Sequence, residues 1–266
     1  MKSWVRVTKA NPCPVCRKGS WCLINSEVVL CMRVESSKPH PLKSGEMGWL
    51  HSLERPMPRP RGKVSPTPRT QVDCRALMAK WRAATKPQDL TALAHSLTVE
   101  EWALKSIGCV WAQEHNAWAF PFWDGLGHII GIQLRSKTGF KWTMTGTHNG
   151  LIQSTVTVQP TTLICEGASD CCAALGLGYY AIGRPSCSGG APMIKDLFRR
   201  LRVNRAIIVA DNDLPGLNGA KLLAEGLHIP SVVITVPTKD LRMFVQMGGT
   251  RDVIDSLVNS SIWKCR

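Results

Sequence analysis

The sequence predicts an α/β domain, in which helices flank a parallel sheet, preceded by a mixed α+β basic subdomain and a small cysteine-rich β unit. From residue 161 onward, strand-like and helix-like segments alternate, which is typical of parallel strands joined by helices. Residues 54–70 are rich in proline and basic side chains, so they predict a linker. Residues 1–53 hold closely spaced cysteines in a segment too short for a large core.

The chain is strongly basic, with 33 Lys and Arg against 19 Asp and Glu and a net charge of +14. This excess favours a polyanionic partner, nucleic acid first, over a surface that is basic only for solubility. The basic residues concentrate in 55–69 and again in 199–205. No apolar run approaches the roughly 20 residues that span a bilayer, and the N-terminus lacks an apolar signal core. We therefore expect a cytoplasmic protein with no membrane partner.

The N-terminal segment, residues 1–53, is expected to bind zinc. It begins with a C-P-x-C turn at Cys13 and Cys16, and Cys22 and Cys31 lie on a predicted hairpin that would bring them together. Four thiolates form a closed tetrahedral zinc site, and in so small a unit the metal would contribute to folding. For the fourth ligand Cys22 is our choice, with the imidazoles of His40 and His51 as alternatives. The 11 cysteines, an odd number, argue against a disulfide framework.

Residues 71–158 are expected to form the mixed subdomain. Apolar residues recur at helical spacing in 74–82 and 98–107, and Thr98 with Glu101 forms a capping-box pattern at the start of the second helix. Residues 118–123 and 129–135 alternate around a turn at 124–128, which indicates a hairpin. Residues 139–146 predict a further strand.

Residues 159–266 are expected to form the α/β domain. The predicted strands are 161–167, 179–183, 205–213 and 231–237, and the predicted helices are 168–178, 191–201, 216–227 and 251–260. In such sheets the functional groups gather at the carboxyl ends of the strands.

Acidic residues follow the strands of this predicted sheet. Glu166 ends the first strand, Asp211 and Asp213 end a later one, Asp170 comes four residues after Glu166, and Asp240 follows the last strand. Their carboxylates should converge at one edge, where they would repel one another without a cation. Hard oxygen ligands suit Mg²⁺ or Mn²⁺, and such ions support phosphoryl transfer. The alternative is that these acids only cap loops and turns.

The runs LICEGASD and VADNDLPGLNGA resemble the Toprim domain of DnaG-type primases, topoisomerases, recombination proteins and some nucleases. The resemblance covers roughly residues 160–258. It implies that Asp211 and Asp213 hold metal, and that Glu166 also serves in acid or base work. Asp240 resembles the first acid of a phage-primase motif whose second acid is absent from this chain.

The segment before the α/β domain resembles the basic subdomain of DnaG-type and phage-type primases. That resemblance implies that Arg135 and Lys141 approach template and nucleotide phosphates, where basic side chains give affinity independent of sequence. Lys137 lies nearby and is equally consistent with a solvated turn residue. The order of zinc ribbon, basic subdomain and Toprim domain is the order found in these primases.

The resemblance predicts a DNA primase of a phage, plasmid or other mobile element. It would synthesise short RNA primers on single-stranded DNA from ribonucleoside triphosphates by metal-dependent nucleotidyl transfer, with structural Zn²⁺ and catalytic Mg²⁺ or Mn²⁺. The alternatives are a Toprim-type metal-dependent nuclease and a non-catalytic adaptor that binds single-stranded DNA in replication. The sequence contains no P-loop motif, so a replicative helicase, if one is needed, is expected to be a separate protein.

Overall fold

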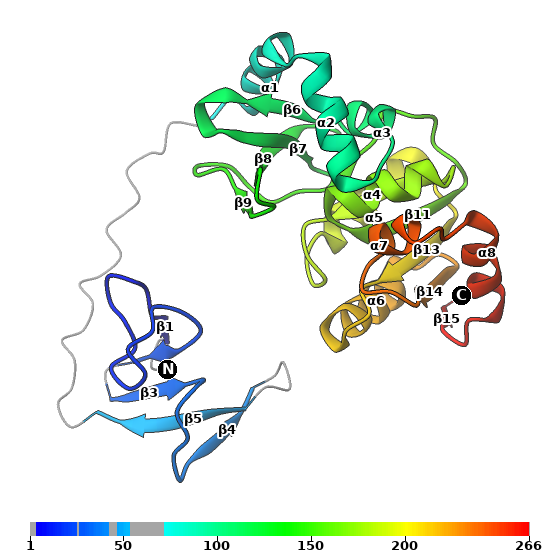
Figure 1. Ribbon diagram of the computed structural model, residues 1–266. Coiled ribbons are helices and arrows are strands. Elements are labelled where there is room, and N and C mark those ends of the chain that lie inside the picture. The colour runs from blue at the N-terminus through cyan, green and yellow to red at the C-terminus, as the bar shows by residue number, and fades with distance from the viewer. Residues whose placement is uncertain (1–3, 26, 43–46, 54–71, 266) are drawn as a thin grey trace. The chain divides into compact units, whose positions relative to one another are not determined.

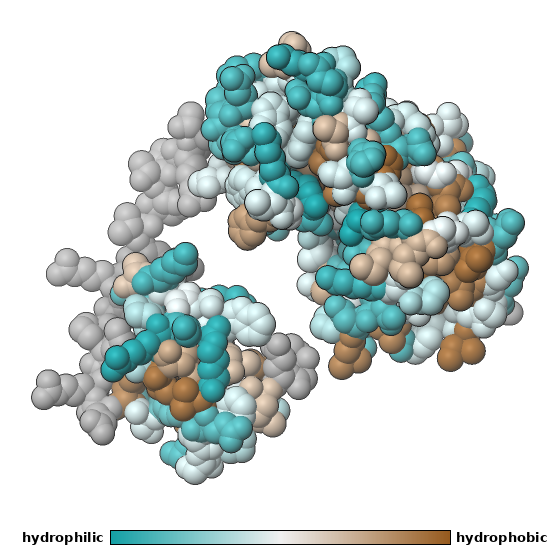
Figure 2. Space-filling model, in the orientation of Figure 1, coloured by the Kyte–Doolittle hydropathy of each residue, from teal (hydrophilic) through white to brown (hydrophobic). Residues whose placement is uncertain are grey.

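The computed structural model describes residues 4–25, 27–42, 47–53 and 72–265 (Figure 1). These residues form two compact units, an N-terminal unit up to residue 53 and a C-terminal unit from residue 72. The predicted linker, 54–70, lies outside the described residues. In Figure 2, hydrophilic residues cover much of the surface of each unit, and smaller groups of hydrophobic residues lie among them on the same surface. Among the described helices, none has both the length and the apolar character that crossing a bilayer requires.

The N-terminal unit is an antiparallel sheet around a very small core. Its strands, in the spatial order β1-β2-β3-β5-β4, are β1 (Val5–Arg6), β2 (Leu23–Ile24), β3 (Val28–Cys31), β4 (Pro39–Pro41) and β5 (Met47–Ser52). The buried core cluster consists of Val7, Val29 and three cysteines, Cys13, Cys22 and Cys31. Sulfur therefore occupies most of the space that apolar side chains fill in a larger domain.

The C-terminal unit begins with three helices packed beside a four-stranded antiparallel sheet. The helices are α1 (Cys74–Ala84), α2 (Pro87–Leu97) and α3 (Glu101–Ser106), and the strands in spatial order are β6 (Val110–Ala112), β7 (Ala117–Trp123), β8 (Ile129–Ser136) and β9 (Lys141–Thr143). Strands β7 and β8 pair antiparallel around the turn at 124–128, so the predicted hairpin is present.

The predicted capping box at Thr98 is wrong. Thr98 ends α2 in the left-handed conformation, φ 54°, and its N–H bonds the carbonyl oxygens of Ala94 and His95. The chain has to reverse between two short helices here, and the left-handed residue makes that turn. The Glu101 carboxylate instead accepts a hydrogen bond from the Thr91 hydroxyl at 2.5 Å.

The rest of the C-terminal unit is a six-stranded sheet with helices on both faces. Its spatial order is β10 (Ile152–Gln153), β12 (Tyr180–Arg184), β11 (Thr161–Glu166), β13 (Arg205–Ala210), β14 (Ser231–Thr235) and β15 (Lys264–Cys265). The four central strands are parallel and the two edge strands are antiparallel. The helices are α4 (Gly167–Gly176), α5 (Ala191–Leu201), α6 (Leu214–Leu227), α7 (Leu241–Gln246) and α8 (Arg251–Ser260).

Side chains alternate between the two faces of this sheet. Leu163 and Ile207 belong to the core cluster that includes residues of α4, α7 and α8, whereas their neighbours Ile164 and Ile208 pack with α5 and α6. A strand buried on both faces reads as a continuous apolar run, which is why these strands were recognisable in the sequence. The sheet is therefore a rigid base, and its carboxyl edge carries the predicted acids.

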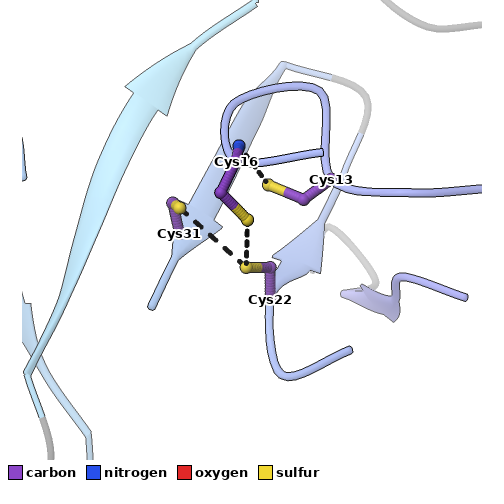
Figure 3. Close-up of side chains that lie close together, drawn as sticks. All are labelled: Cys13, Cys16, Cys22 and Cys31. Carbon is purple, nitrogen blue, oxygen red and sulfur yellow. Dashed lines mark hydrogen bonds between the residues drawn. The ribbon is translucent and has the colours of Figure 1, made fainter. Parts of the chain in front are cut away.

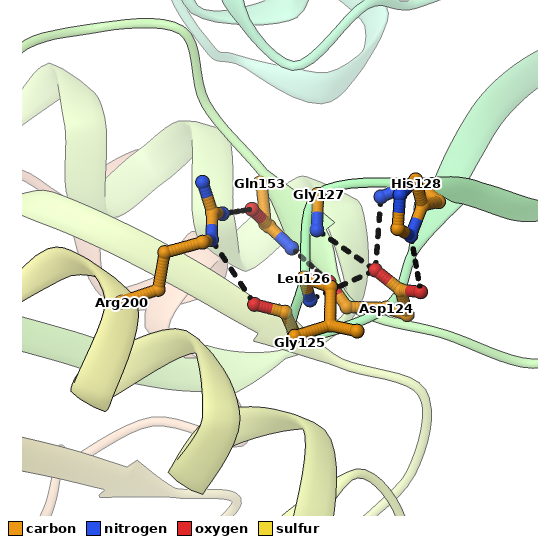
Figure 4. A network of polar contacts seen from close by, with 7 residues as sticks. All are labelled: Asp124, Gly125, Leu126, Gly127, His128, Gln153 and Arg200. Atoms are coloured by element: carbon orange, nitrogen blue, oxygen red, sulfur yellow. Dashed lines mark hydrogen bonds and ion pairs between the residues drawn. The ribbon is translucent and has the colours of Figure 1, made fainter.

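A polar network joins the two parts of the C-terminal unit (Figure 4). The Asp124 carboxylate accepts hydrogen bonds from the N–H groups of residues 126–128 and so shapes the β7–β8 turn. The Arg200 side chain on α5 donates to the Gly125 carbonyl oxygen at 3.1 Å and to Gln153 Oε1 at 3.5 Å. A Cβ at Gly125 would lie 2.4 Å from the Met193 carbonyl oxygen. The turn therefore packs directly on α5, which holds the antiparallel sheet against the parallel one.

Candidate functional site

The four N-terminal cysteines form a compact sulfur cluster (Figure 3). Their ligand atoms all lie within 4.8 Å of one another. The Cys16 and Cys22 sulfurs are 3.6 Å apart, and those of Cys22 and Cys31 are 3.9 Å apart. A tetrahedral zinc with Zn–S bonds of about 2.3 Å places its sulfurs about 3.8 Å apart. The donor set and its spacing therefore fit a structural zinc.

Local backbone structure brings these sulfurs together. Leu23 pairs with Leu30 across β2 and β3, which places Cys22 beside Cys31. A tight turn follows Cys13, where the Arg17 N–H donates to the Cys13 carbonyl oxygen at 2.7 Å. Burial alone would raise the pKa of Cys16, but a backbone hydrogen bond at Lys18 and the neighbouring thiols lower that pKa to about 6. Cys16 thus favours a thiolate, the form that binds metal, whereas burial raises the pKa of Cys13 and of Cys22.

The two alternative zinc ligands lie outside the cluster. The His51 Nε2 atom is 2.9 Å from the Val34 carbonyl oxygen, and His40 lies on the exposed strand β4. Within the described part of the chain, only the four cysteines bring three or more His, Cys or carboxylate ligand atoms within 4.8 Å. The geometry therefore favours Cys22 as the fourth ligand.

The predicted acids lie at the carboxyl edge of the parallel sheet. Glu166 ends β11, and the left-handed Gly167, φ 78°, turns the chain at once into α4. Asp211 follows β13, the direct neighbour of β11. The Asp213 carboxylate accepts a hydrogen bond from the Gly216 N–H at 2.7 Å, and Asp240 accepts one from the Met243 N–H at 2.7 Å. The last two acids therefore cap α6 and α7 as well as facing the edge.

The carboxylates lie close enough to influence one another's ionisation. Burial raises the pKa of Glu166, and the charges of Asp211 and Asp213 raise it further. Burial also raises the pKa of Asp211, followed by the charges of Asp240 and Asp213. No three of these acids bring their oxygens within 4.8 Å of one another, so a divalent ion held here would keep several of its waters, as Mg²⁺ does.

Asp170 is the most buried of these acids. Its side chain lies in the first turn of α4 and is 6% exposed. It accepts a hydrogen bond from the Arg242 N–H at 2.8 Å. Burial, and then the charges of Asp240 and Asp211, raise the pKa of Asp170 to about 7. A nearby cation would restore its ionised form.

Two of the three predicted basic residues face these acids. The residue Lys141 is exposed as a whole, but its ammonium group is buried. That burial and the neighbouring Arg135 lower the pKa of Lys141, while the charges of Asp170 and Asp240 oppose the shift. Burial likewise lowers the pKa of Arg135, and the charge of Asp170 opposes that shift. Lys137 is different, because its ammonium lies over the Trp111 ring, 5.0 Å from the ring centre.

A hollow of about 500 Å³ lies between α2 and the β8–β9 turn. Its wall includes Trp111 and Trp118, which meet edge to face with ring centres 5.0 Å apart. Arg135 and Lys137 also line it. Trp118 is 7% exposed, so Trp111 supplies the accessible aromatic surface. An accessible ring beside cations is the combination that holds unpaired nucleotides.

Arg184 is a buried charge that we did not predict from the sequence. It pairs in register with Glu166 across β11 and β12 and is 3% exposed. Its guanidinium donates to the carbonyl oxygens of Gly189 at 3.2 Å and Gly219 at 3.5 Å, and to that of Cys187. Its charge lowers the pKa of Glu166, against the larger effect of burial. A basic residue at the end of a buried strand was the only indication in the sequence.

No family model and no curated protein matches this chain. Solved structures do match it. The DnaG catalytic core aligns with a TM-score of 0.53 and 17% identity, covering 70% of this chain and 79% of the other. The chain has the fold of a primase catalytic core. The DnaG primase catalytic domain bound to single-stranded DNA aligns with a TM-score of 0.53 and 15% identity, covering 70% of this chain and 78% of the other. The Aquifex aeolicus primase, with its zinc-binding and RNA polymerase domains, aligns with a TM-score of 0.52 and 13% identity, covering 72% of this chain and 60% of the other.

Proposed function

We propose that this chain is a DNA primase that joins ribonucleotides into short RNA primers on single-stranded DNA. One observation carries the proposal: acids on neighbouring strands of a primase-core fold face two basic residues across the carboxyl edge of the sheet. Carboxylates suit divalent metal, and basic side chains suit phosphate. That combination is the one nucleotidyl transfer requires.

The division of labour follows from the positions of the side chains. Glu166, Asp211 and Asp213 would hold Mg²⁺ or Mn²⁺, with Asp170 and Asp240 completing the acidic edge, and Glu166 would also take part in acid or base work. The bound ions would stabilise charge on the attacking and leaving oxygens. These residues belong to a Toprim domain, which we assign to 159–266.

Arg135 and Lys141 would contact template and nucleotide phosphates in a basic subdomain, 71–158. The hollow beside the half-buried Trp111 would accept an unpaired template base, with Lys137 at its edge. In this arrangement the template would approach from the antiparallel sheet toward the acids. A solved primase domain of this fold is bound to single-stranded DNA, which supports the same ligand here.

The zinc ribbon, 1–53, would help to select where synthesis begins. Trp21 is 67% exposed, so it is free to stack on a base. The Arg33 guanidinium lies 5.9 Å from the centre of the Trp21 ring. A basic linker, 54–70, would let this unit approach the template, and a separate replicative helicase would supply single-stranded DNA.

A primer-synthesis assay tests the proposal. The full chain is incubated with labelled ribonucleoside triphosphates, a panel of short single-stranded templates, and Mg²⁺ or Mn²⁺. Short oligoribonucleotides that depend on both template and metal are expected. Shortened DNA templates without RNA would instead indicate a nuclease. DNA binding with neither product would indicate an adaptor.

A further inference from the structure

A second hollow, of about 380 Å³, lies where α5 and α6 end. Strands β13 and β14 begin at this edge of the sheet, with Arg205 and Ser231. The acids at Glu166 and Asp211 lie at the opposite edge, because the strands are parallel and six residues span about 20 Å. The hollow is therefore separate from the proposed catalytic site.

Basic side chains surround this hollow, which we call the α5–α6 pocket. Lys195 and Arg199 reach it from α5, Arg202 from the residue that ends α5, and His228 from the residue that ends α6. Arg199 pairs with Asp196 at 2.8 Å. Within the described chain, Lys195 and Arg202 form no ion pair. The neighbouring Arg200, by contrast, is held in the network of Figure 4.

Cations near helix C-termini can simply favour the helix dipole. The backbone argues for more than that. Arg202 and His228 both adopt the left-handed conformation, φ 55° and 56°, and a helix end of this kind favours glycine. Thr98 at the end of α2 has the same conformation, but Arg202 and His228 differ from it in that both line one hollow. Strain of this kind gathers at ligand sites.

The floor of the α5–α6 pocket is apolar. Phe198, Val203 and Leu227 are 4%, 6% and 6% exposed, and Ile229 completes the lining. The Phe198 ring is buried, and the one exposed ring of the lining, the imidazole of His228, lies at the end of α6 and carries none of the apolar floor. An aliphatic side chain would fit the floor, and carboxylates on either side of it would meet the cations.

We propose that the α5–α6 pocket binds an acidic segment of a protein partner, with one aliphatic side chain in the hollow and carboxylates against Lys195, Arg199 and Arg202. This inference does not depend on the proposed catalytic activity. Charge complementarity identifies the class of partner, and the apolar floor distinguishes a peptide from nucleic acid.

Fluorescence anisotropy tests the proposal with the full chain. The probe is a labelled peptide of about twelve Asp and Glu residues with one central Leu, and the matched peptide carries Ser instead of Leu. The Leu peptide should bind, and the Ser peptide should bind about tenfold more weakly, since a buried Leu contributes that much or more. The double variant Arg199→Glu, Arg202→Glu should weaken binding of the Leu peptide by about tenfold or more. Arg75→Glu, which reverses an exposed charge on α1, should not.

Three results would overturn the proposal. The native chain could fail to bind the Leu peptide. It could bind the Leu and Ser peptides equally, which would reduce the pocket to a general charge effect. The double variant could lose affinity for labelled oligo(dT) as strongly as for the peptide, which would make this surface part of the nucleic-acid path.

The strained helix ends allow a second test. Arg202→Gly and His228→Gly relieve the left-handed backbone, so the melting temperature should stay the same or rise by about 2–4 °C, while affinity for the Leu peptide falls. A purely structural role predicts the same melting behaviour with unchanged affinity for the Leu peptide. Unchanged peptide affinity in both variants would therefore overturn the proposal.

Discussion

The two candidate metal sites of this chain are built in opposite ways. In the N-terminal unit, four sulfurs already lie at the spacing of a zinc tetrahedron and form most of the buried core. In the C-terminal unit, the carboxylates are spread along the edge of a sheet that has large apolar cores on both faces. We therefore expect the first site to need its ion in order to fold, and the second to belong to a body that folds without one.

The difference also concerns charge. Backbone hydrogen bonds favour a thiolate at Cys16 before any metal binds. Burial and neighbouring carboxylates raise the pKa of Glu166, Asp211 and Asp170, that of Asp170 to about 7. The closed set of four thiolates is expected to hold its ion in place, while ions at the acidic edge can come and go with substrate.

The largest effect expected is the loss of zinc. A chelator, or Cys22→Ser, should unfold the described part of the N-terminal unit, because structural zinc contributes about 10–16 kcal/mol at neutral pH. The C-terminal unit should melt as before. Two-dimensional NMR of the full chain would show this as a loss of dispersed signals from the N-terminal unit alone. Cys265→Ser, outside the cluster, is the control. A folded N-terminal unit without metal would show that zinc is not required for folding, and would contradict the contrast drawn between the two sites.

Next in size is the loss of catalysis at the acidic edge. Asp211→Asn should lower primer synthesis by about 10²- to 10³-fold, the usual cost of one electrostatic contact to the transition state. The melting temperature should not fall, since the substitution removes repulsion from Asp213 and Asp240. Asp252→Asn, at an exposed carboxylate of α8, should leave synthesis unchanged. If Asp211→Asn kept full activity, the catalytic role of this edge would be wrong.

The pH dependence of stability sharpens the contrast further. The pKa of Asp170 is about 7 in the folded chain, well above that of a free aspartate, so the folded state retains a proton that the unfolded state releases. Without divalent ions, stability should therefore fall as pH rises from about 4 to about 7, by a few kcal/mol in all. Asp170→Asn should flatten this trend, because the amide does not titrate while its oxygen can still accept the Arg242 N–H. Thermal melts of the zinc-loaded protein from pH 5 to 8 would follow the upper part of this range.

Mg²⁺ provides the check on that result. It should stabilise the native C-terminal unit most at pH 8, where Asp170 would otherwise carry an uncompensated charge, and should stabilise Asp170→Asn less. A native pH profile identical to that of Asp170→Asn would show that this carboxylate is not a source of strain.

The smallest effect is expected at His51. His51→Ala removes a hydrogen bond to the Val34 carbonyl oxygen, which is worth about 1 kcal/mol, and should leave the zinc content at one ion per chain. Metal analysis after gel filtration would measure it beside Cys22→Ser. Loss of zinc from His51→Ala would return the histidine to the ligand set.

The sequence predicted best what depends on local spacing. The hairpin that joins Cys22 to Cys31 and the strands that end at Glu166 and Asp211 are short-range patterns with a continuous apolar signature. The two-residue edge strands β10 and β15 carry too little pattern to be recognised. Helix α7 was also missed, because six residues give no periodicity and because Asp240 was interpreted as a candidate metal ligand and not as the N-cap of a helix.

Contacts between distant segments could not be predicted. Arg184 is satisfied by carbonyl oxygens of residues 187, 189 and 219, and no spacing in the sequence reveals that arrangement. Thr98 matched a capping pattern, yet the turn between two helices required a left-handed residue there. In both cases tertiary packing determines the outcome.

Two of the acids accept hydrogen bonds from the N-terminus of helix α7. The N–H groups of Arg242 and Met243 donate to Asp170 and Asp240, one oxygen of each carboxylate, and so short a helix is not stable by itself. Each acid has a second oxygen left for an ion. Amide hydrogen exchange at these two positions should consequently slow or quicken as the ion binds, so that they report its occupancy in the intact protein without any label.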